Sequence, residues 1–293
     1  MANLRGIVLM IIAMGCFAVS DAFLKVLTQT VPRGQILIIF GLAGGILLGT
    51  VATLRGARLF GPWFLRPVFL TRLAADMFAA TAIVSAFALA SLSLVSAIMQ
   101  VSPLVAALTA AWLLGERVGP WRLGAIGIGL LGVLIILEPW GERIELGAIF
   151  AAVGACLLAL RDVLTRKMPD DTPYEALVTY GILAMAPGGL ILFLADPAWV
   201  PVAPGQGALF AAGILSGILG YTTITLASRM AEISAIAPFR YSRLVFALLI
   251  GGIAFGERLP PHALFGAALV IGTGLFVFWR EARLRGAQSD RER

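Results

Sequence analysis

The chain alternates long apolar runs with short segments that carry proline, glycine or charge. An apolar run of about 20 residues is long enough to cross a bilayer as one helix. Ten runs are therefore predicted as membrane-spanning helices, at residues 4–24, 35–54, 69–90, 93–114, 120–138, 146–165, 174–194, 206–228, 233–255 and 261–279. The pattern predicts an all-α polytopic membrane protein with ten transmembrane helices.

The second half of this pattern repeats the first. Gly115-Glu116-Arg117 ends one apolar run, and Gly256-Glu257-Arg258 ends another at an offset of 141 residues. Self-similarity at a fixed offset indicates a duplicated structural unit. Other pairs of identical or similar residues keep the same offset: Gly6 and Gly147, Asp21 and Asp162, Lys25 and Arg166.

Two units are predicted, at residues 4–138 and 145–279, followed by a charged cytoplasmic tail at 280–293. Each unit holds five spans, and because five is odd, the two units must cross the membrane in opposite directions. Inverted repeats of this kind are typical of secondary transporters, which bind their substrate near the midplane where the repeats meet. Two similar halves can exchange conformations, so the central cavity can open to either side.

Composition and charge agree with this class. The chain is 60% hydrophobic and 13% charged, and its mean hydropathy is +0.96. Soluble domains carry about 25% charged residues. The net charge of +6 could suggest a nucleic-acid partner. However, the basic residues lie in short loops and in the tail, which is a sign of membrane topology. The expected partners are the lipid bilayer and a small-molecule substrate.

The distribution of Lys and Arg predicts the orientation. If the N-terminus is cytoplasmic, fifteen of them fall at inner loops and ends, and four fall outside. Cytoplasmic loops carry an excess of Lys and Arg. Both termini are therefore predicted to be cytoplasmic, in a multi-pass protein of a bacterial-type inner membrane.

Two five-span repeats, each with a Gly-Glu-Arg turn before its last span, resemble the EamA-type repeats of the drug/metabolite transporter superfamily. Within it, the chain is similar to amino-acid exporters of the YddG type. The resemblance implies a central cavity lined mainly by the third, fourth, eighth and ninth spans, with the first and sixth contributing. It also implies efflux of small metabolites such as neutral and aromatic amino acids. An inverted duplication favours a carrier that acts as a monomer.

Polar and charged groups inside spans are costly and usually face the protein interior or water. The candidate substrate-binding residues are Asp76, Gln100, Tyr221, Arg240, Tyr241 and Arg243. Arg240 and Arg243 are three residues apart and share a helix face. Such cations need an anion, and Asp76 is the partner expected from its depth. One hypothesis is that an arginine binds a substrate carboxylate while Asp76 binds its amino group. The alternative is a purely structural ion pair.

Other charged residues are candidates for gates or turns. Asp21 and Asp162 are repeat counterparts near opposite faces, and each could form part of a gate. The alternative is a helix-end charge paired one turn on, with Lys25 for Asp21 and with Arg166 for Asp162. Glu116 and its counterpart Glu257 are expected to fix tight turns through a neighbouring arginine or the exposed amides of the next helix.

Two prolines fall inside predicted cavity spans. Pro103 lies in the fourth span and Pro238 in the ninth. A proline inside a helix removes a backbone hydrogen bond and permits a kink. Both prolines are hinge candidates, and a static bend is the alternative.

Catalytic and cofactor motifs are absent from the sequence. It contains no phosphate-binding Gly-x-x-x-x-Gly-Lys loop, no His-Glu-x-x-His and no Gly-x-Ser-x-Gly. We therefore expect no enzyme, no cofactor and no metal, and we interpret Cys16 and Cys156 as small apolar residues. The leading hypothesis is an amino-acid exporter that works by alternating access. The alternatives are a transporter of a different metabolite or drug, a channel, or a membrane-embedded enzyme. Proton coupling and facilitated diffusion both stay open.

Overall fold

The structure is a computed structural model that describes residues 2–115, 119–137, 145–169, 171–230 and 236–289. Its elements are α1 (Ala2–Leu27), α2 (Arg33–Leu54), α3 (Pro67–Leu89), α4 (Leu92–Met99), α5 (Ser102–Leu114), α6 (Pro120–Leu137), α7 (Leu146–Arg166), α8 (Tyr174–Leu183), α9 (Met185–Ala195), α10 (Pro204–Met230), the 3-10 helix η1 (Ala237–Tyr241), α12 (Ser242–Phe255) and α13 (Pro261–Ser289).

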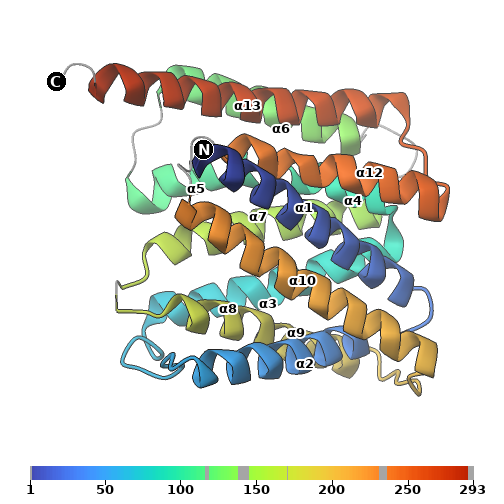
Figure 1. The fold of residues 1–293 in the computed structure, drawn as a ribbon. Coiled ribbons are helices and arrows are strands. Elements are labelled where there is room, and N and C mark those ends of the chain that lie inside the picture. The colour runs from blue at the N-terminus through green and yellow to red at the C-terminus, as the bar shows by residue number, and fades with distance from the viewer. Residues whose placement is uncertain (1, 116–118, 138–144, 170, 231–235, 290–293) are drawn as a thin grey trace.

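The all-α membrane fold is confirmed. In the described part of the chain, nine helical stretches are long and apolar enough to cross a membrane, and a shorter apolar helix, Leu123–Leu137, lies at the fifth predicted span. The start of α1 and the end of α13 lie at the same end of the molecule (Figure 1). The predicted tail is helical up to Ser289, because α13 continues beyond the last span.

Three predicted spans are broken in the middle. The fourth is divided into α4 and α5, the seventh into α8 and α9, and the ninth into η1 and α12. Pro103 lies in the first turn of α5, directly after the break in the fourth span. Pro238 lies at the start of η1. This corrects the prediction that they lie inside continuous helices. A proline fits the first turn of a helix because its missing N–H would have no partner there. The hinge role itself stays a prediction.

The two halves pack reciprocally. α1 packs chiefly on α10, and α3, the counterpart of α10, packs chiefly on α7, the counterpart of α1. Counterparts also pack on each other: α6 lies along α13 at one edge of the molecule, and α2 lies along α8 and α9 at the other (Figure 1). Reciprocal contacts of this kind define a two-fold interface. The chain therefore forms a pseudo-dimer of inverted halves.

Individual contacts locate the pseudo-two-fold axis. A Cβ added at Gly154 would lie 3.7 Å from the carbonyl oxygen of Ala79. In the related contact, a Cβ at Gly220 would lie 3.2 Å from the carbonyl oxygen of Ala13. A residue meets its own counterpart only on the axis. The Gln100 side chain does so, because its Nε2 donates to the backbone oxygen of Tyr241 at 3.1 Å across 141 residues. In an inverted repeat this axis lies in the membrane plane, so the contact marks the midplane.

Glycines allow α2 to approach α8 and α9 closely. A Cβ at Gly41 would lie 2.5 Å from the backbone nitrogen of Ala186, and one at Gly45 would lie 2.4 Å from Leu183. Gly124 in α6 differs, since an added Cβ there meets nothing within 4 Å. Small residues serve close helix packing in membranes, but here only some of the glycines do so.

Gly41→Ala is therefore expected to destabilise the protein by about 1–3 kcal/mol, because overpacking forces backbone shifts. Thermal unfolding in detergent measures this effect. Gly124→Ala is the matched control, and it should melt at or above the wild-type temperature because alanine favours helix and meets open space. Equal melting temperatures for Gly41→Ala and the wild type would contradict this packing.

Candidate functional site

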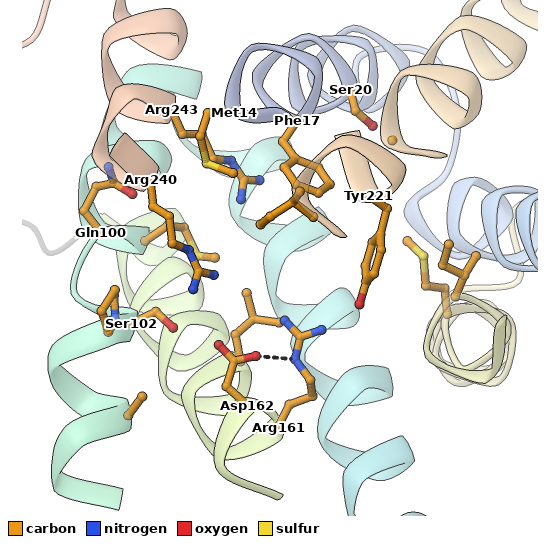
Figure 2. Close-up of a pocket in the computed structure, with 18 of the residues that line it drawn as sticks. Met14, Phe17, Ser20, Gln100, Ser102, Arg161, Asp162, Tyr221, Arg240 and Arg243 are labelled. Carbon is orange, nitrogen blue, oxygen red and sulfur yellow. Dashed lines mark ion pairs between the residues drawn. The ribbon is translucent and has the colours of Figure 1, made fainter. Parts of the chain in front are cut away.

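A cavity of about 890 Å³ lies between the two halves. Its wall comes from α1, α5, α7, α10, η1 and the start of α12, with residues from α2, α4, α8 and α9. None of the described residues of α3 lines it, so the third span is not the main wall that the family resemblance implied. The first and sixth spans, expected only to contribute, supply much of the charged and aromatic surface (Figure 2).

The cavity is built around the pseudo-two-fold axis. Residues at equivalent positions of the two repeats line it from both sides: Ser20 and Arg161, Met99 and Arg240, Gln100 and Tyr241, Ser102 and Arg243. The offset that relates these positions is visible in the sequence. Applied to Arg161 and Arg243, it would have found Ser20 and Ser102, which sequence reasoning missed. Phe17, also missed, has no comparable sequence signal.

Arg243 pairs with Asp21. Its Nη2 and Nε lie 2.6 and 3.0 Å from Oδ2 of Asp21, whose side chain is 9% exposed. The guanidinium also lies 5.5 Å from the ring centroid of Phe17, which adds a cation–π contact. The predicted pairing of Arg243 with Asp76 is wrong, and so is the pairing of Asp21 with Lys25. The first error arises because depth alone does not show which helices are neighbours. The second arises because one-turn spacing within α1 does not reveal that Lys25 donates to backbone oxygens beyond that helix.

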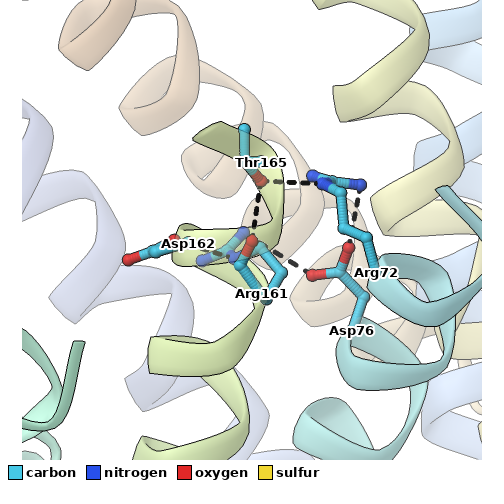
Figure 3. A network of polar contacts seen from close by, with 5 residues as sticks. All are labelled: Arg72, Asp76, Arg161, Asp162 and Thr165. Atoms are coloured by element: carbon cyan, nitrogen blue, oxygen red, sulfur yellow. Dashed lines mark hydrogen bonds and ion pairs between the residues drawn. The ribbon is translucent and has the colours of Figure 1, made fainter. Parts of the chain in front are cut away.

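Asp76 belongs to a buried cluster behind the cavity wall (Figure 3). Its carboxylate oxygens lie 3.1 Å from Arg72 Nη1 and 3.6 Å from Arg161 Nη1. Arg72, which is 2% exposed, also donates to Thr165 Oγ1 at 2.9 Å. Asp76 does not line the cavity, so it is not placed to bind a substrate amino group as predicted. The geometry matches the alternative, a structural ion pair.

Asp162 extends the same cluster into the cavity. Its Oδ1 lies 2.9 Å from Nε of Arg161, the residue before it, and its side chain is 40% exposed. Arg161 therefore stands between a buried carboxylate and one that faces the cavity. Arg161 is therefore one partner of Asp162, and the pairing of Asp162 with Arg166 stays a prediction.

The remaining candidates differ in how they face the cavity. Tyr221 lines it and meets Phe17 edge to face, with ring centroids 6.4 Å apart. Arg240 also lines it and is exposed there. Tyr241 is only 5% exposed, and its hydroxyl packs against Gly274 of α13. Its hydroxyl is therefore directed away from the cavity, while its backbone oxygen holds Gln100.

The cavity extends to one end of the molecule. It is lined there by Arg166 and Tyr174, which flank the connection between α7 and α8. At the opposite end, Lys25 of α1 donates to the backbone oxygens of Phe87, at 2.8 Å, and of Ala90. A cation is favourable at the C-terminus of a helix such as α3. Lys25 thus ties α1 to α3 at this end.

Glu257 of the second repeat stabilises the same end of the molecule as Lys25. Its carboxylate accepts hydrogen bonds from the backbone N–H groups of Leu92 and Ser93, at 2.8 and 2.9 Å, and from the Ser93 hydroxyl. It therefore caps α4 of the other repeat, not the helix that follows it, which corrects the prediction. Glu116 lies outside the described residues. At this end, burial raises the pKa of the Glu145 carboxyl, and the Lys25 ammonium opposes that shift.

The tight turns expected at the two Gly-Glu-Arg sequences have a common geometry at their first residue. Gly115 and Gly256 end α5 and α12 in the left-handed conformation, with φ of 68° and 65°. Glycine adopts this conformation without steric cost. The repeated motif therefore marks equivalent helix ends in the two halves.

The family model of EamA-like transporters matches residues 4–138 and 145–279. The chain belongs to the EamA-like transporter family. This places it in the drug/metabolite transporter superfamily, whose members are named as transporters and not as enzymes. The chain is a multi-pass membrane protein of a bacterial-type transporter family.

Curated relatives are similar over part of their length. A riboflavin transporter of Rhizobium johnstonii is 30% identical over 64% of this chain and 62% of its own. A riboflavin transporter of Vibrio cholerae is 29% identical over 67% and 64%. An S-adenosylmethionine uptake transporter of Rickettsia conorii is 24% identical over 62% and 61%. In each case the match spans less than two thirds of the relative.

One solved crystal structure superposes with a TM-score of 0.65 at 22% sequence identity, covering 97% of this chain and 98% of the other. At this level of identity the likeness shows the fold alone.

The buried cluster leads to a stability prediction. Asp76→Asn leaves Arg72 and Arg161 without their shared carboxylate, and breaking a buried ion pair costs about 3–5 kcal/mol. We expect a clear fall in the melting temperature of the purified protein. Asp162→Asn is the control, because its partly exposed pair contributes at most about 1 kcal/mol. The structural role would be refuted by an Asp76→Asn protein that melts like the wild type.

Proposed function

We propose that this chain is a secondary carrier that moves a small metabolite across the membrane by alternating access. The observation that carries this proposal is the cavity on the pseudo-two-fold axis, which reaches one end of the molecule while Lys25 and Glu257 hold the other end together. Because the two halves are inverted, each contact that closes one end of the molecule has an equivalent pair of positions at the other end. The described lining residues come from both halves of a single chain, which supports a carrier that acts as a monomer.

The excess of Lys and Arg supports an orientation with both termini in the cytoplasm. The end that the cavity reaches is the end where both termini lie (Figure 1). In this orientation the conformation faces inward, and Lys25 and Glu257 close the outer side. Asp21 and Asp162, together with the helix breaks at Pro103 and Pro238, stay candidates for the gates and hinges of the transition.

The cavity favours a substrate with a planar ring. Ligand pockets measure about 300–1,000 Å³, so 890 Å³ is ample for a metabolite of vitamin size. Phe17, Tyr174 and Tyr221 supply aromatic surface on its wall. Relatives named as riboflavin and S-adenosylmethionine transporters support a heteroaromatic metabolite.

Export of neutral or aromatic amino acids is the second candidate. It is favoured by the arginines and the partly exposed Asp162 that face one cavity, because an amino acid carries both charges. An aromatic amino acid also presents a ring to Phe17 and Tyr221. The two candidates share the fold and the mechanism, and they differ in the substrate.

Transport by purified protein in liposomes tests the proposal. Radiolabelled riboflavin, S-adenosylmethionine and tryptophan are each supplied outside vesicles that contain none or a large excess of the same unlabelled compound. A carrier gives saturable uptake of at least one compound, and the unlabelled excess accelerates it. Vesicles without protein are the control. Flux that rises linearly with concentration, or an ion current, would indicate a channel and overturn the proposal.

A further inference from the structure

The two repeats are alike in fold but not in the charge that they present to the cavity. Four arginines of the second repeat line the cavity. Arg166 lies at the end that the cavity reaches, and the other three lie near the axis: Arg161, Arg240 and Arg243. Their counterparts in the first repeat are Ser20, Met99 and Ser102. At these three positions the second repeat therefore presents arginine where the first repeat presents an uncharged side chain.

Two of these arginines are neutralised by the protein itself. Arg243 pairs with Asp21 at 2.6 Å, and Arg161 pairs with Asp162 and lies 3.6 Å from Asp76. The charge of Asp76 is further balanced by Arg72, which is buried behind the wall. These three arginines and three aspartates together carry no net charge. Their ion pairs occupy N–H groups of Arg161 and Arg243 that a ligand could otherwise use.

Arg240 has a different environment. Among the described residues, no carboxylate forms an ion pair with it, and its side chain is exposed in the cavity. Its guanidinium points into the open space between Arg243 and Asp162 (Figure 2). Arg240 therefore leaves one positive charge in the cavity.

Arg240 also lies near the middle of the membrane. It precedes Tyr241, whose backbone oxygen meets Gln100 on the pseudo-two-fold axis. A charge at this depth is costly and usually marks a substrate or ion pathway.

We propose that Arg240 binds an anionic group of the transported metabolite, a carboxylate or a phosphate, and that it selects such substrates over uncharged analogues. This rests on the carrier function proposed above and names the substrate class of the same cavity. Guanidinium groups bind carboxylate and phosphate with two parallel hydrogen bonds. Met99, the counterpart across the axis, offers a flexible apolar surface to the ring of the substrate.

Matched ligand pairs test this proposal. Indole-3-propionate and tryptamine share a ring but only the first has a carboxylate, and FMN and riboflavin differ by a phosphate. Binding to the purified full-length protein is measured from the ligand-dependent rise in melting temperature. We expect the wild type to bind the anionic member of at least one pair roughly tenfold more tightly than its partner.

Arg240→Met copies the residue that the first repeat holds at this position, so the fold is expected to accept it. It should lose roughly tenfold or more of the affinity for the preferred anion and keep its affinity for the uncharged or cationic partner. Arg240→Lys should retain part of the preference, because it keeps the charge but not the planar fork. Arg258→Met is the control, since it removes one positive charge from an exposed loop outside the cavity.

The proposal is overturned if neither anion binds better than its partner, or if Arg240→Met binds the anion as tightly as the wild type. It is distinguishable from the carrier function by counterflow in liposomes. Accelerated exchange of riboflavin or tryptamine with no preference for the anions would sustain the carrier and refute the role of Arg240. No counterflow with any compound would count against the carrier itself.

Discussion

The pseudo-two-fold axis organises the structure, and one contact locates it: the hydrogen bond from the Gln100 side chain to the backbone oxygen of its own repeat counterpart, Tyr241. A residue can meet its counterpart only on the axis that relates the two halves, so this contact places the axis at the break between α4 and α5. The helices are interrupted there, and the cavity surrounds the same point. Breaks in spanning helices are tolerated where they line a cavity. Symmetry therefore accounts for the position of the site.

Charge then makes the symmetric site specific. The carboxylates of Asp21, Asp76 and Asp162 are engaged by arginines of the same chain. Some of these pairs join the halves, as Asp21 and Arg243 do across 222 residues. Charged groups in a membrane are retained when they pair or face water. Arg240 takes part in none of these pairs, so its positive charge is available to the substrate.

Much of the fold could be predicted from the sequence, because the offset of 141 residues and the length of each apolar run are local signals. The partners of the charged residues could not. Glu257 caps α4 of the other repeat, and Asp76 meets Arg161 instead of Arg243, since these contacts depend on which helices are neighbours. The breaks at the fourth and ninth spans were indicated only by Pro103 and Pro238. Once the cavity arginines are known, subtracting the repeat offset from their numbers identifies other residues of the cavity wall, such as Ser20 and Ser102.

The most direct test of the central claim is a pair of distances measured by spin labelling in a background without the two native cysteines. Labels at Val26 and Ile253 report on the closed end of the structure, and labels at their counterparts, Lys167 and Trp112, report on the end that the cavity reaches. If the halves exchange conformations, substrate in reconstituted vesicles should shift the two distances in opposite senses. Distances that both stay fixed, or that change in the same sense, would contradict alternating access through this cavity.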